Sequence, residues 1–456
     1  MKNLIRQFID RCHRDKLSIH CIGDAMIDEY YEVRINKIST EHPLPVMRCQ
    51  NDIISKPGGA SNVAYQFNNV NAEVNLFTLN DNLANKIYKN FNFNHYPLGT
   101  SANLPIKRRF TQDYRQVCSR LDIEFENCNL SNESLNEIFE ELKYHIKNKF
   151  VPDVVIFSDY NKGFFNSNKN FISLYPNSIT IVDPKSDDLD KWQNCTVFKP
   201  NAQEAFDLSG ISNWKDQCKY FIKKLNCKSV VITYSGNGVK GFDGSQYFEY
   251  SPEIEHISVE SVIGAGDCFA AFLGLALGHG FSLESSSKIA HHAGLMYVQN
   301  KQNRPIVLAE LVPDKIINPL DIVKRDFSLA FTNGCFDILH IGHLETLKFA
   351  KSKADKLVVA VNSDDSIKRL KGLNRPIVSL EHRQAILAAL NMVDFVIPFN
   401  DNTPKEIIEL IKPNCLIKGG DYQSDEIIGR EFVEEVYIAP FISNYSSSKF
   451  IKIIEE

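Results

Sequence analysis

From Leu17 onward, the chain alternates between short apolar runs and longer amphipathic segments. The apolar runs are rich in β-branched residues and have the length of buried strands: Ile19–Ile22, Val74–Phe77, Val154–Phe157, Ile179–Val182, Val197–Phe198 and Val230–Thr233. Apolar residues at helical spacing fill the segments between them, for example Ser134–Lys147 and Trp214–Leu225. Alternation of this kind predicts an α/β domain with a mainly parallel sheet.

Two stretches interrupt this alternation. Between Arg34 and Ile54 the pattern changes to short alternating strands without helices, which predicts a small sheet appended to the main one. From Leu311 to Asp326 the chain is punctuated by proline and mixed in charge, which predicts a domain joint. We therefore expect three parts, which are a first domain over residues 1–312, a linker over 313–326 and a second domain over 327–456.

The second domain begins with the pattern of a strand, a turn and a helix. The apolar run Ser328–Phe331 is followed by Leu344, Leu347 and Phe349 at helical spacing, and then by the strand-like Leu357–Val361. Residues 333–342 therefore lie in a strand-to-helix turn that opens a βαβ unit. The size of this domain suits one Rossmann-like unit.

Two histidines mark that turn. The stretch Phe331–His343 reads F-T-N-G-C-F-D-I-L-H-I-G-H, so His340 and His343 lie three residues apart where the helix begins. Residues at this spacing share a helix face, and a helix N-terminus attracts anions. The pattern suits a phosphate whose negative charge grows during reaction. The alternative is a pair of surface histidines on an ordinary α/β turn.

The first domain has a glycine-rich segment before an apolar helix. Gly264, Ala265 and Gly266 are followed by Asp267, and small residues at a helix start leave N–H donors open to a phosphate. Asp267 would then stand where a general base takes a hydroxyl proton.

Two further stretches could bind a ligand. Asp24 ends the first strand, where parallel sheets bind ligands, and Asp28 follows four residues later. The segment Lys56–Asn62 places the glycine pair Gly58 and Gly59 ahead of a helix. Taken alone, each of these two stretches could equally be a plain turn.

Composition excludes several classes of protein. The 456 residues carry a net charge of -5 and 43% hydrophobic residues, without a basic tail, which argues against nucleic-acid binding. The 11 cysteines are scattered without a C-x-x-C pair, which favours reduced thiols and a cytoplasmic location. The N-terminus, Met1–Lys16, has the pattern of an amphipathic helix rather than a signal peptide. The longest apolar run, Cys268–Leu277, is too short for a membrane span.

With G-A-G-D, the glycine pair and Asn201–Glu204, residues 17–310 resemble the ribokinase-like carbohydrate kinases. The resemblance implies that Asp267 is the catalytic base, and that the anion hole consists of Gly264, Ala265 and Gly266. It implies that the sugar is bound by Asp24, Asp28, Gly58, Gly59 and Asn62. It implies that Asn201 and Glu204 help to hold the Mg²⁺ of ATP, through water if at all, and that Ser235 and Gly238 lie in a segment on the nucleotide side. The small appended sheet would be a lid that closes over the sugar and pairs two subunits in a homodimer.

The chain departs from that family in two places. Ser261, Val262 and Ile263 precede G-A-G-D where related kinases carry Asp and Thr, and a glycine-rich segment is replaced by Gln299–Arg304. A catalytically weak or retired kinase half therefore stays open as an alternative.

The stretch that ends in H-x-G-H resembles the cytidylyltransferase-like nucleotidyltransferases. The resemblance implies that His340 and His343 stabilise charge at the α-phosphate while a substrate phosphate displaces pyrophosphate, without a side-chain nucleophile. It implies nucleotide contacts by residues from four segments: Thr332, Asn333, Gly334, Phe336 and Asp337; Lys371 and Arg383; Lys418, Gly420 and Asp421; Ser446 and Ser447. It assigns no residue as a direct metal ligand.

Over nearly its full length, the chain resembles bacterial bifunctional enzymes that join a heptose-7-phosphate kinase to a heptose-1-phosphate adenylyltransferase. The resemblance implies ATP-dependent phosphorylation of D-glycero-β-D-manno-heptose 7-phosphate at the anomeric hydroxyl. It then implies adenylyl transfer from ATP to heptose 1-phosphate, which gives ADP-heptose for lipopolysaccharide. The implied partners are sugar phosphates and ATP with Mg²⁺, with no nucleic acid and no membrane.

Two alternatives remain. The second domain could be a cytidylyltransferase for another sugar or polyol phosphate. Alternatively, the first domain could bind sugar without catalysis and regulate the second.

Overall fold

The structure is a computed structural model. It describes the residues 1–49, 53–100, 102–112, 116–124, 130–147, 151–166, 169–252, 262–299, 304–419 and 427–440. The chain forms two compact units, which hold Asn3–Ile306 and Val307–Glu456, and each is described by itself. Among the described residues, each helix is too short or too polar to cross a lipid bilayer.

The first unit is built on a sheet with the strand order β14-β13-β12-β11-β10-β9-β1-β5-β6. Its described strands are β1 (Leu17–Gly23), β5 (Ala72–Leu79), β6 (Asn94–Leu98), β9 (Val154–Ser158), β10 (Ile179–Asp183), β11 (Val197–Phe198), β12 (Ser229–Thr233), β13 (Val239–Phe242) and β14 (Tyr247–Tyr250). Neighbouring strands from β12 to β6 are parallel, and only β13 and β14 run antiparallel to their neighbours. Each strand predicted from the hydrophobic pattern is therefore confirmed.

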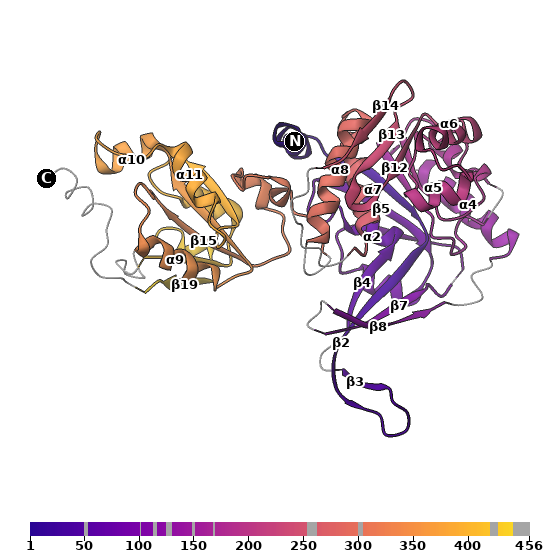
Figure 1. Cartoon of the computed structure of the whole chain (residues 1–456), viewed down its shortest axis with the longest axis horizontal. Coiled ribbons are helices and arrows are strands. Elements are labelled where there is room, and N and C mark those ends of the chain that lie inside the picture. Colours follow the sequence, from indigo (N-terminus) through magenta and orange to yellow (C-terminus); the bar gives the residue numbers. More distant parts are fainter. Residues whose placement is uncertain are drawn as a thin grey trace. The chain divides into compact units, whose positions relative to one another are not determined.

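Helices cover both faces of this sheet (Figure 1). The described helices are α1 (Lys2–Arg14), α2 (Ala60–Tyr65), α3 (Asn82–Tyr88), α4 (Asn132–Lys147), α5 (Ala202–Ser209), α6 (Trp214–Leu225), α7 (Ala265–Gly278) and α8 (Leu283–Val298). Helix α7 packs closely on one face, because a Cβ added at Gly274 would lie 3.1 Å from both Val154 and Ile156. Helix α6 packs on the other face, where the ring of Phe221 lies 4.9 Å from that of Phe198.

The strand order reverses between β1 and β9. From β1 the chain continues to β5 and β6 on one side, whereas β9, β10, β11 and β12 follow on the other side. In parallel α/β sheets, ligands bind outside the carboxyl ends of the strands at such a reversal. The ends of β1, β9 and β10 are Gly23, Ser158 and Asp183, so this edge is where a site is expected.

A second sheet of the first unit contains the predicted appended strands. Its described strands are β2 (Ala25–Ile38), β3 (Pro45–Cys49), β4 (Ile54–Gly59), β7 (Ile106–Gln112) and β8 (Gln116–Ile123). The sequence pattern predicted strands between Arg34 and Ile54 but missed β7 and β8, which complete the sheet. The hairpin of β2 and β3 projects from the body of its unit (Figure 1).

The second unit is a smaller sheet in the order β17-β16-β15-β18-β19, with all neighbours parallel. Its described elements are β15 (Leu329–Gly334), β16 (Lys356–Asn362), β17 (Phe395–Phe399), β18 (Cys415–Lys418), β19 (Glu435–Ile438), α9 (Ile341–Lys351), α10 (Asp364–Lys371), α11 (Leu380–Ala388) and α12 (Lys405–Ile411). The strand order reverses between β15 and β18, which is the arrangement predicted for a Rossmann-like unit.

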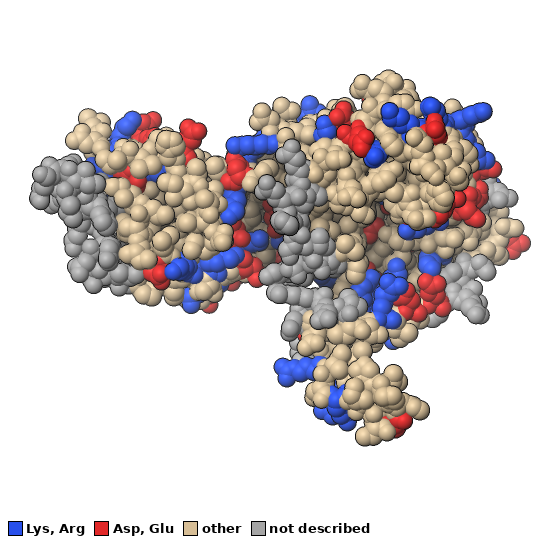
Figure 2. All heavy atoms as spheres, in the orientation of Figure 1, with Lys and Arg blue, Asp and Glu red and all other residues tan. Residues whose placement is uncertain are grey.

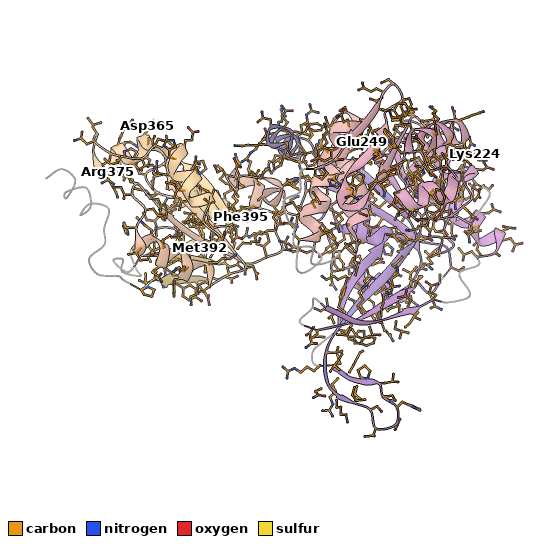
Figure 3. All side chains as sticks on the ribbon, viewed as in Figure 1. Lys224, Glu249, Asp365, Arg375, Met392 and Phe395 are labelled. Carbon is orange, nitrogen blue, oxygen red and sulfur yellow. The ribbon has the colours of Figure 1, made fainter. Side chains whose placement is uncertain are left out.

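Figure 3 helps to orient the second unit. Asp365 and Arg375 lie at the carboxyl edge of its sheet, since α10 follows the end of β16. Met392 and Phe395 lie at the amino edge, where β17 begins.

The segment expected to be a linker packs on the second unit. The Ile317 N–H donates to the Val396 carbonyl at 2.9 Å, and the Lys315 ammonium donates to the Val393 carbonyl at 2.9 Å. The Arg325 guanidinium donates to the Ile411 carbonyl at the end of α12 at 2.7 Å. The compact units thus divide before Val307, whereas proline and mixed charge had suggested a joint over 313–326.

This packing predicts different stabilities for two fragments of the second unit. The fragment 307–456 keeps buried Ile317 and Ile322, whereas the fragment 327–456 loses both. Each fully buried isoleucine stabilises a protein by roughly 1.5–3 kcal/mol. We therefore expect the free energy of unfolding of the shorter fragment to be lower than that of the longer one by about 3 kcal/mol or more. Urea unfolding of the two fragments measures the difference. Equal midpoints would show that residues 307–326 add nothing to the stability of this unit.

Candidate active sites

The first candidate site lies where α7 begins. Asp267 is buried in the first turn of α7, and each of its carboxylate oxygens accepts one hydrogen bond. The Asn62 amide donates to Oδ2 at 2.6 Å, and the Tyr160 hydroxyl donates to Oδ1 at 2.7 Å. These three residues come from α2, from the loop after β9 and from α7, so the fold brings them together at the predicted edge of the sheet.

The environment of Asp267 suits a general base. Burial raises the pKa of its carboxyl to about 6, while the hydrogen bonds from Asn62 and Tyr160 act to lower it. At pH 7 the carboxylate is therefore ionised and can accept a proton. A base with a pKa close to the working pH transfers protons most effectively.

Gly264 permits the close packing around this carboxylate. It precedes α7 in the left-handed region, with φ of 79°. A Cβ added there would lie 2.7 Å from the Asn62 amide nitrogen and 2.8 Å from the Tyr297 hydroxyl. Gly266, two residues later, has nothing within 4 Å of such a Cβ. Gly264 is thus required by its surroundings, whereas Gly266 leaves open space beside Ala265 at the helix start.

On the sugar side, Asp28 lies beside the predicted residues Asn62, Gly58 and Gly59. Its carboxylate forms a buried ion pair with Arg109 at 2.6 Å, and a Cβ added at Gly58 would lie 3.1 Å from it. One small pocket is lined by residues of the lid and of the helices behind it, among them Asp28, Tyr30, Lys56, Asn62, Ile263 and Tyr297. Two of the predicted sugar-binding residues, Asp28 and Asn62, therefore line one cavity together with the basic residue Lys56.

Asp24, which was predicted to bind the sugar, has hydrogen-bond partners within the protein. Its buried carboxylate accepts hydrogen bonds from the backbone N–H groups of Tyr160, Lys162 and Phe164 at 2.9, 3.0 and 2.9 Å. Burial and the neighbouring Asp159 raise its pKa to about 6, while these bonds act to lower it. The carboxylate predicted to hold a sugar hydroxyl is thus engaged in holding the loop after β9.

The predicted nucleotide side lies along the same edge. The bridge between Asn201 and Thr233 joins the start of α5 to the end of β12, and the turn with Ser235 and Gly238 follows. Asn201 and Glu204 cap α5 reciprocally, with the Asn201 N–H donating to the Glu204 carboxylate at 2.8 Å.

Two ion pairs lie near this nucleotide side. Glu204 also pairs with Lys185 at 2.6 Å. Buried Lys199 pairs with Asp183 at 2.9 Å at the end of β10.

The second candidate site lies where α9 begins. His340 is the N-cap of α9, and its backbone N–H donates to His343 Nδ1 at 3.4 Å. The two imidazoles stack with centroids 3.9 Å apart and planes at 29°. Phe336, with φ of 47°, packs its ring 5.1 Å from that of His343. The two predicted histidines therefore lie side by side at the N-terminus of α9.

Both histidines are neutral at pH 7. Burial lowers the pKa of His340, and burial followed by the charges of His340 and Lys371 lowers that of His343 to about 4. A neutral imidazole keeps one N–H donor, and a bound triphosphate would raise both pKa values.

The strand-order reversal of the second unit holds three more of the predicted residues. The Lys418 ammonium, at the end of β18, donates to the Asn333 side-chain oxygen at the end of β15. The Thr332 hydroxyl donates to the Ile417 carbonyl at 3.0 Å and joins the same two strands. A Cβ at Gly334 would lie 3.1 Å from the Phe336 ring, so the backbone runs close to that side chain.

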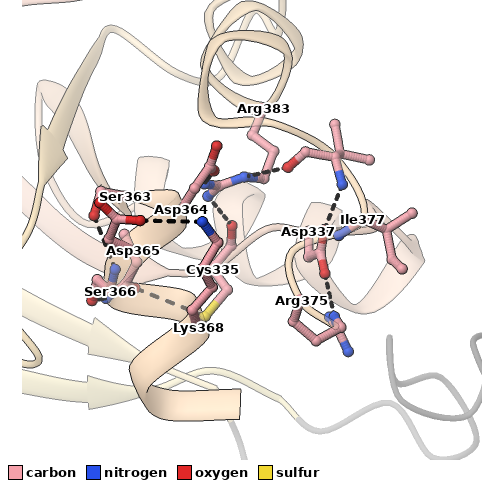
Figure 4. A network of polar contacts seen from close by, with 12 residues as sticks. Cys335, Asp337, Ser363, Asp364, Asp365, Ser366, Lys368, Arg375, Ile377 and Arg383 are labelled. Atoms are coloured by element: carbon pink, nitrogen blue, oxygen red, sulfur yellow. Dashed lines mark hydrogen bonds and ion pairs between the residues drawn. The ribbon is translucent and has the colours of Figure 1, made fainter. Parts of the chain in front are cut away.

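Figure 4 shows that Asp337 and Arg383 are bound within the protein. The Asp337 carboxylate accepts from the N–H groups of Ile377 at 2.7 Å and Val378 at 2.9 Å, and pairs with Arg375. The side chain of Arg383 is 0% exposed. Its guanidinium donates to three acceptors, which are the carbonyls of Val378 and Cys335 and the Asp364 carboxylate.

Arg383, which was predicted to contact phosphate, is therefore enclosed by protein acceptors in this structure. Arg383 instead joins the turn after β15 to the start of α10. The sequence pattern could not show this, because the three acceptors come from separate segments.

Of the basic cluster on and after α10, Lys371 is the cation that faces the histidines. Lys368 pairs with Asp365 at 3.2 Å, and Arg369 donates to Asn402 at 3.0 Å. Lys371 is exposed and makes no ion pair within the described part of the chain, and its charge lowers the pKa of His343.

Other predictions lie outside the described residues, namely those for Gly420, Asp421, Ser446 and Ser447. Conversely, sequence reasoning missed Tyr160, Arg109 and Lys199. Tyr160 directly follows the acidic end of the predicted strand over Val154–Phe157, and that position was the available signal.

Comparison with known proteins agrees with the two units. Residues 164–307 match the pfkB family of carbohydrate kinases, and residues 331–453 match the cytidylyltransferase-like family. The crystal structure of phosphofructokinase-2 from Escherichia coli with substrates and products aligns with a TM-score of 0.50 and 15% identity. It covers 65% of this chain and 97% of that protein, and at this identity it supports the fold alone.

Relatives over the full length are more specific. "Bifunctional protein HldE" of Hydrogenovibrio crunogenus is 31% identical, over 97% of this chain and 97% of that protein. The protein of the same name from Psychromonas ingrahamii is 33% identical, over 96% of this chain and 98% of that protein. Fold and sites define a two-part transferase, a carbohydrate kinase followed by a nucleotidyltransferase. The chain belongs to the family of the bifunctional protein HldE.

The packing around Gly264 predicts that alanine substitutions at Gly264 and Gly266 differ in their effect on stability. Gly264→Ala forces a left-handed backbone and a contact with Asn62, so we expect it to lower the free energy of unfolding by roughly 2–4 kcal/mol. Gly266→Ala is the matched control and should leave stability unchanged or slightly raised, because its Cβ meets open space in a helix. Thermal or urea unfolding measures both. A Gly264→Ala protein as stable as the control would contradict the packing described.

Proposed function

We propose that the chain catalyses two ATP-consuming steps in the synthesis of ADP-heptose. The first unit would phosphorylate the anomeric hydroxyl of D-glycero-β-D-manno-heptose 7-phosphate. The second would join heptose 1-phosphate to AMP and release pyrophosphate. The observation that carries this proposal is that one chain holds a buried, two-donor carboxylate at Asp267 and a stacked pair of histidines at His340 and His343.

In the first step, an Asp267 oxygen takes the proton of the anomeric hydroxyl as that oxygen attacks the γ-phosphorus of ATP. The bond between the γ-phosphorus and its bridging oxygen breaks, and ADP leaves. Backbone N–H groups at the start of α7, around Gly264 and Ala265, would stabilise the transferring phosphoryl group. Asp28, Asn62 and the glycine pair would hold the sugar.

In the second step, a phosphate oxygen of heptose 1-phosphate attacks the α-phosphorus of ATP, and the bond to pyrophosphate breaks. His340 and His343 would donate N–H groups to the α-phosphate as its charge grows. Lys371 would neutralise phosphate charge from the side of α10. Positioning and electrostatic stabilisation then account for the catalysis, since no covalent intermediate with a side chain is needed.

Both steps would use ATP with Mg²⁺. Glu204 and Asn201 offer the oxygen donors that Mg²⁺ prefers, but their side chains cap α5 and Glu204 also pairs with Lys185. They therefore fit contact with the ion through water better than direct ligation. The bound ion would supply neutralisation of phosphate charge.

We also infer that the protein works in the cytoplasm. Ten cysteines among the described residues are free thiols, which suits a reducing compartment. ATP and sugar phosphates, the proposed substrates, are cytoplasmic metabolites.

Paired variants of the full-length chain test the proposal. With D-glycero-D-manno-heptose 7-phosphate, ATP and Mg²⁺, ³¹P NMR should show a new anomeric phosphate and ADP. Asp267→Asn should lower the rate at which this signal appears by about 10²–10⁴-fold, because general base catalysis is lost. His340→Ala should leave the signal intact but abolish pyrophosphate release from heptose 1-phosphate and ATP.

The same assays separate the alternatives. A wild-type enzyme that prefers CTP over ATP in the second step would favour a cytidylyltransferase. No turnover in the first step, with the second intact, would indicate a first unit that only binds sugar. Loss of both activities in either variant would contradict two independent sites.

We further propose that two copies of the chain pair through the lid. The hairpin of β2 and β3 exposes Ile35, Ile38 and Leu44 to 38%, 60% and 62%. In Figure 2 most of the surface of this hairpin belongs to uncharged residues, with a few basic and acidic side chains between them. Apolar side chains on an edge hairpin favour burial against another copy.

Sedimentation of lid variants tests this pairing. The wild-type chain should sediment at twice its chain mass, and a chain with both Ile38→Asp and Leu44→Asp should sediment as a monomer. Leu410→Asp is the matched control, since Leu410 is an exposed leucine of α12 in the second unit, and it should leave the mass unchanged. A double variant that remains dimeric would place the interface elsewhere.

A further inference from the structure

We propose that Tyr160 is a positioning residue for Asp267, whose hydroxyl fixes one oxygen of the base and directs the remaining lone pairs toward the acceptor hydroxyl. The proposal rests on the kinase function proposed above. Tyr160 belongs to none of the sequence motifs described above and has no role in the kinase step as proposed so far.

The Tyr160 loop is held from one side by Asp24. The Asp24 carboxylate captures the N–H groups of Tyr160 and Lys162 on Oδ2 and that of Phe164 on Oδ1, at 2.9, 3.0 and 2.9 Å. Asp24 is itself fixed, because its own N–H donates to the Ser158 carbonyl at 3.1 Å. Three donors on one buried carboxylate leave this loop little freedom to move.

The same loop is held from the other side by Asp159. The Asp159 carboxylate accepts from the Asn161 N–H at 2.8 Å and pairs with buried Lys191 at 3.4 Å. Asn161 and Gly163 adopt left-handed backbone, with φ of 54° and 107°, so the chain turns sharply on both sides of Lys162. A strained turn that is over-determined by its surroundings is characteristic of functional sites.

The fixed loop therefore holds the hydroxyl of Tyr160 at 2.7 Å from Asp267 Oδ1. The other oxygen is held by Asn62 from α2, whose amide orientation is set in turn by Gln66, at 3.1 Å. A carboxylate offers about four lone-pair positions, so the two donors leave acceptor capacity on both oxygens. Because Tyr160 and Asn62 come from different elements, the carboxylate can neither rotate nor shift without losing a bond.

The charges around Asp267 agree with this role. Burial, then the charge of Asp267, raises the pKa of Tyr160 well above its ordinary value, so the phenol remains a donor. The bonds from Tyr160 and Asn62 lower the pKa of Asp267 against the effect of burial. The other titratable groups that interact with this carboxylate are Asp183 at the end of β10, Lys185 after β10, Lys199 after β11, Cys268 of α7 and Tyr297 of α8. None of them donates a hydrogen bond to it among the described residues.

The experiment is a pH profile of the kinase step with full-length Tyr160→Phe, which removes one oxygen and keeps the ring. We expect kcat to fall about tenfold at pH 7 with KM changed less than threefold. The acidic limb of kcat/KM, near pH 6 in the wild type, should move up by roughly one pH unit, because a hydrogen bond to the charged base is lost. A residue with only a structural role would not move this limb.

Tyr175→Phe is the matched control. Tyr175 is a buried tyrosine of the same unit whose hydroxyl meets His20 at 3.2 Å, away from Asp267, so its removal should leave the limb in place. Asp24→Asn is a second test, because an amide nitrogen cannot accept the N–H groups of the loop. It should shift the limb in the same direction as Tyr160→Phe.

The outcomes are distinct. A folded Tyr160→Phe enzyme with the wild-type limb and kcat would overturn the role of Tyr160 while leaving the kinase function standing. An equal shift in Tyr175→Phe would also overturn it, because the effect would then not be specific to the base. Absence of kinase turnover in the wild type would overturn the proposed function, and with it this inference.

Discussion

Each unit depends on the same kind of interaction. In each, a buried carboxylate at the carboxyl edge of the parallel sheet accepts hydrogen bonds from the backbone of a neighbouring loop. In the first unit Asp24 binds three backbone N–H groups of the loop that carries Tyr160. In the second, Asp337 binds two N–H groups and Arg375. Burying a carboxylate costs free energy unless hydrogen-bond donors satisfy it. The carboxylate therefore holds each loop in place beside the candidate site.

Prediction from the sequence reached the features whose signal is local. The hydrophobic pattern predicted β1, β5, β9, β10, β11 and β12 of the first unit and β15 and β16 of the second, because burial on both faces leaves continuous apolar runs. Short motifs predicted Asp267, His340 and His343, since the residues that define each site lie close together at a helix start. Such local signals need no knowledge of distant contacts.

The roles of Asp24 and Arg383 could not be predicted in the same way. Asp24 and its three donors are 136, 138 and 140 residues apart in sequence. The acceptors of Arg383 lie 5, 48 and 19 residues away from it. A sequence motif gives the residue type at a site edge, but only the fold decides whether a charged group meets a ligand or the protein itself. Tyr160 was missed for the same reason, since its partner lies 107 residues away.

The neutral imidazoles at the start of α9 have a consequence for product release. Because burial lowers the pKa of His343 to about 4, the pair adds no positive charge to the site when no phosphate is bound. Among the described residues, attraction for a free anion then comes from the helix N-terminus and nearby lysines. If the pair contacts the leaving pyrophosphate as proposed, neutral imidazoles would hold that anion less strongly than charged ones and so favour its release.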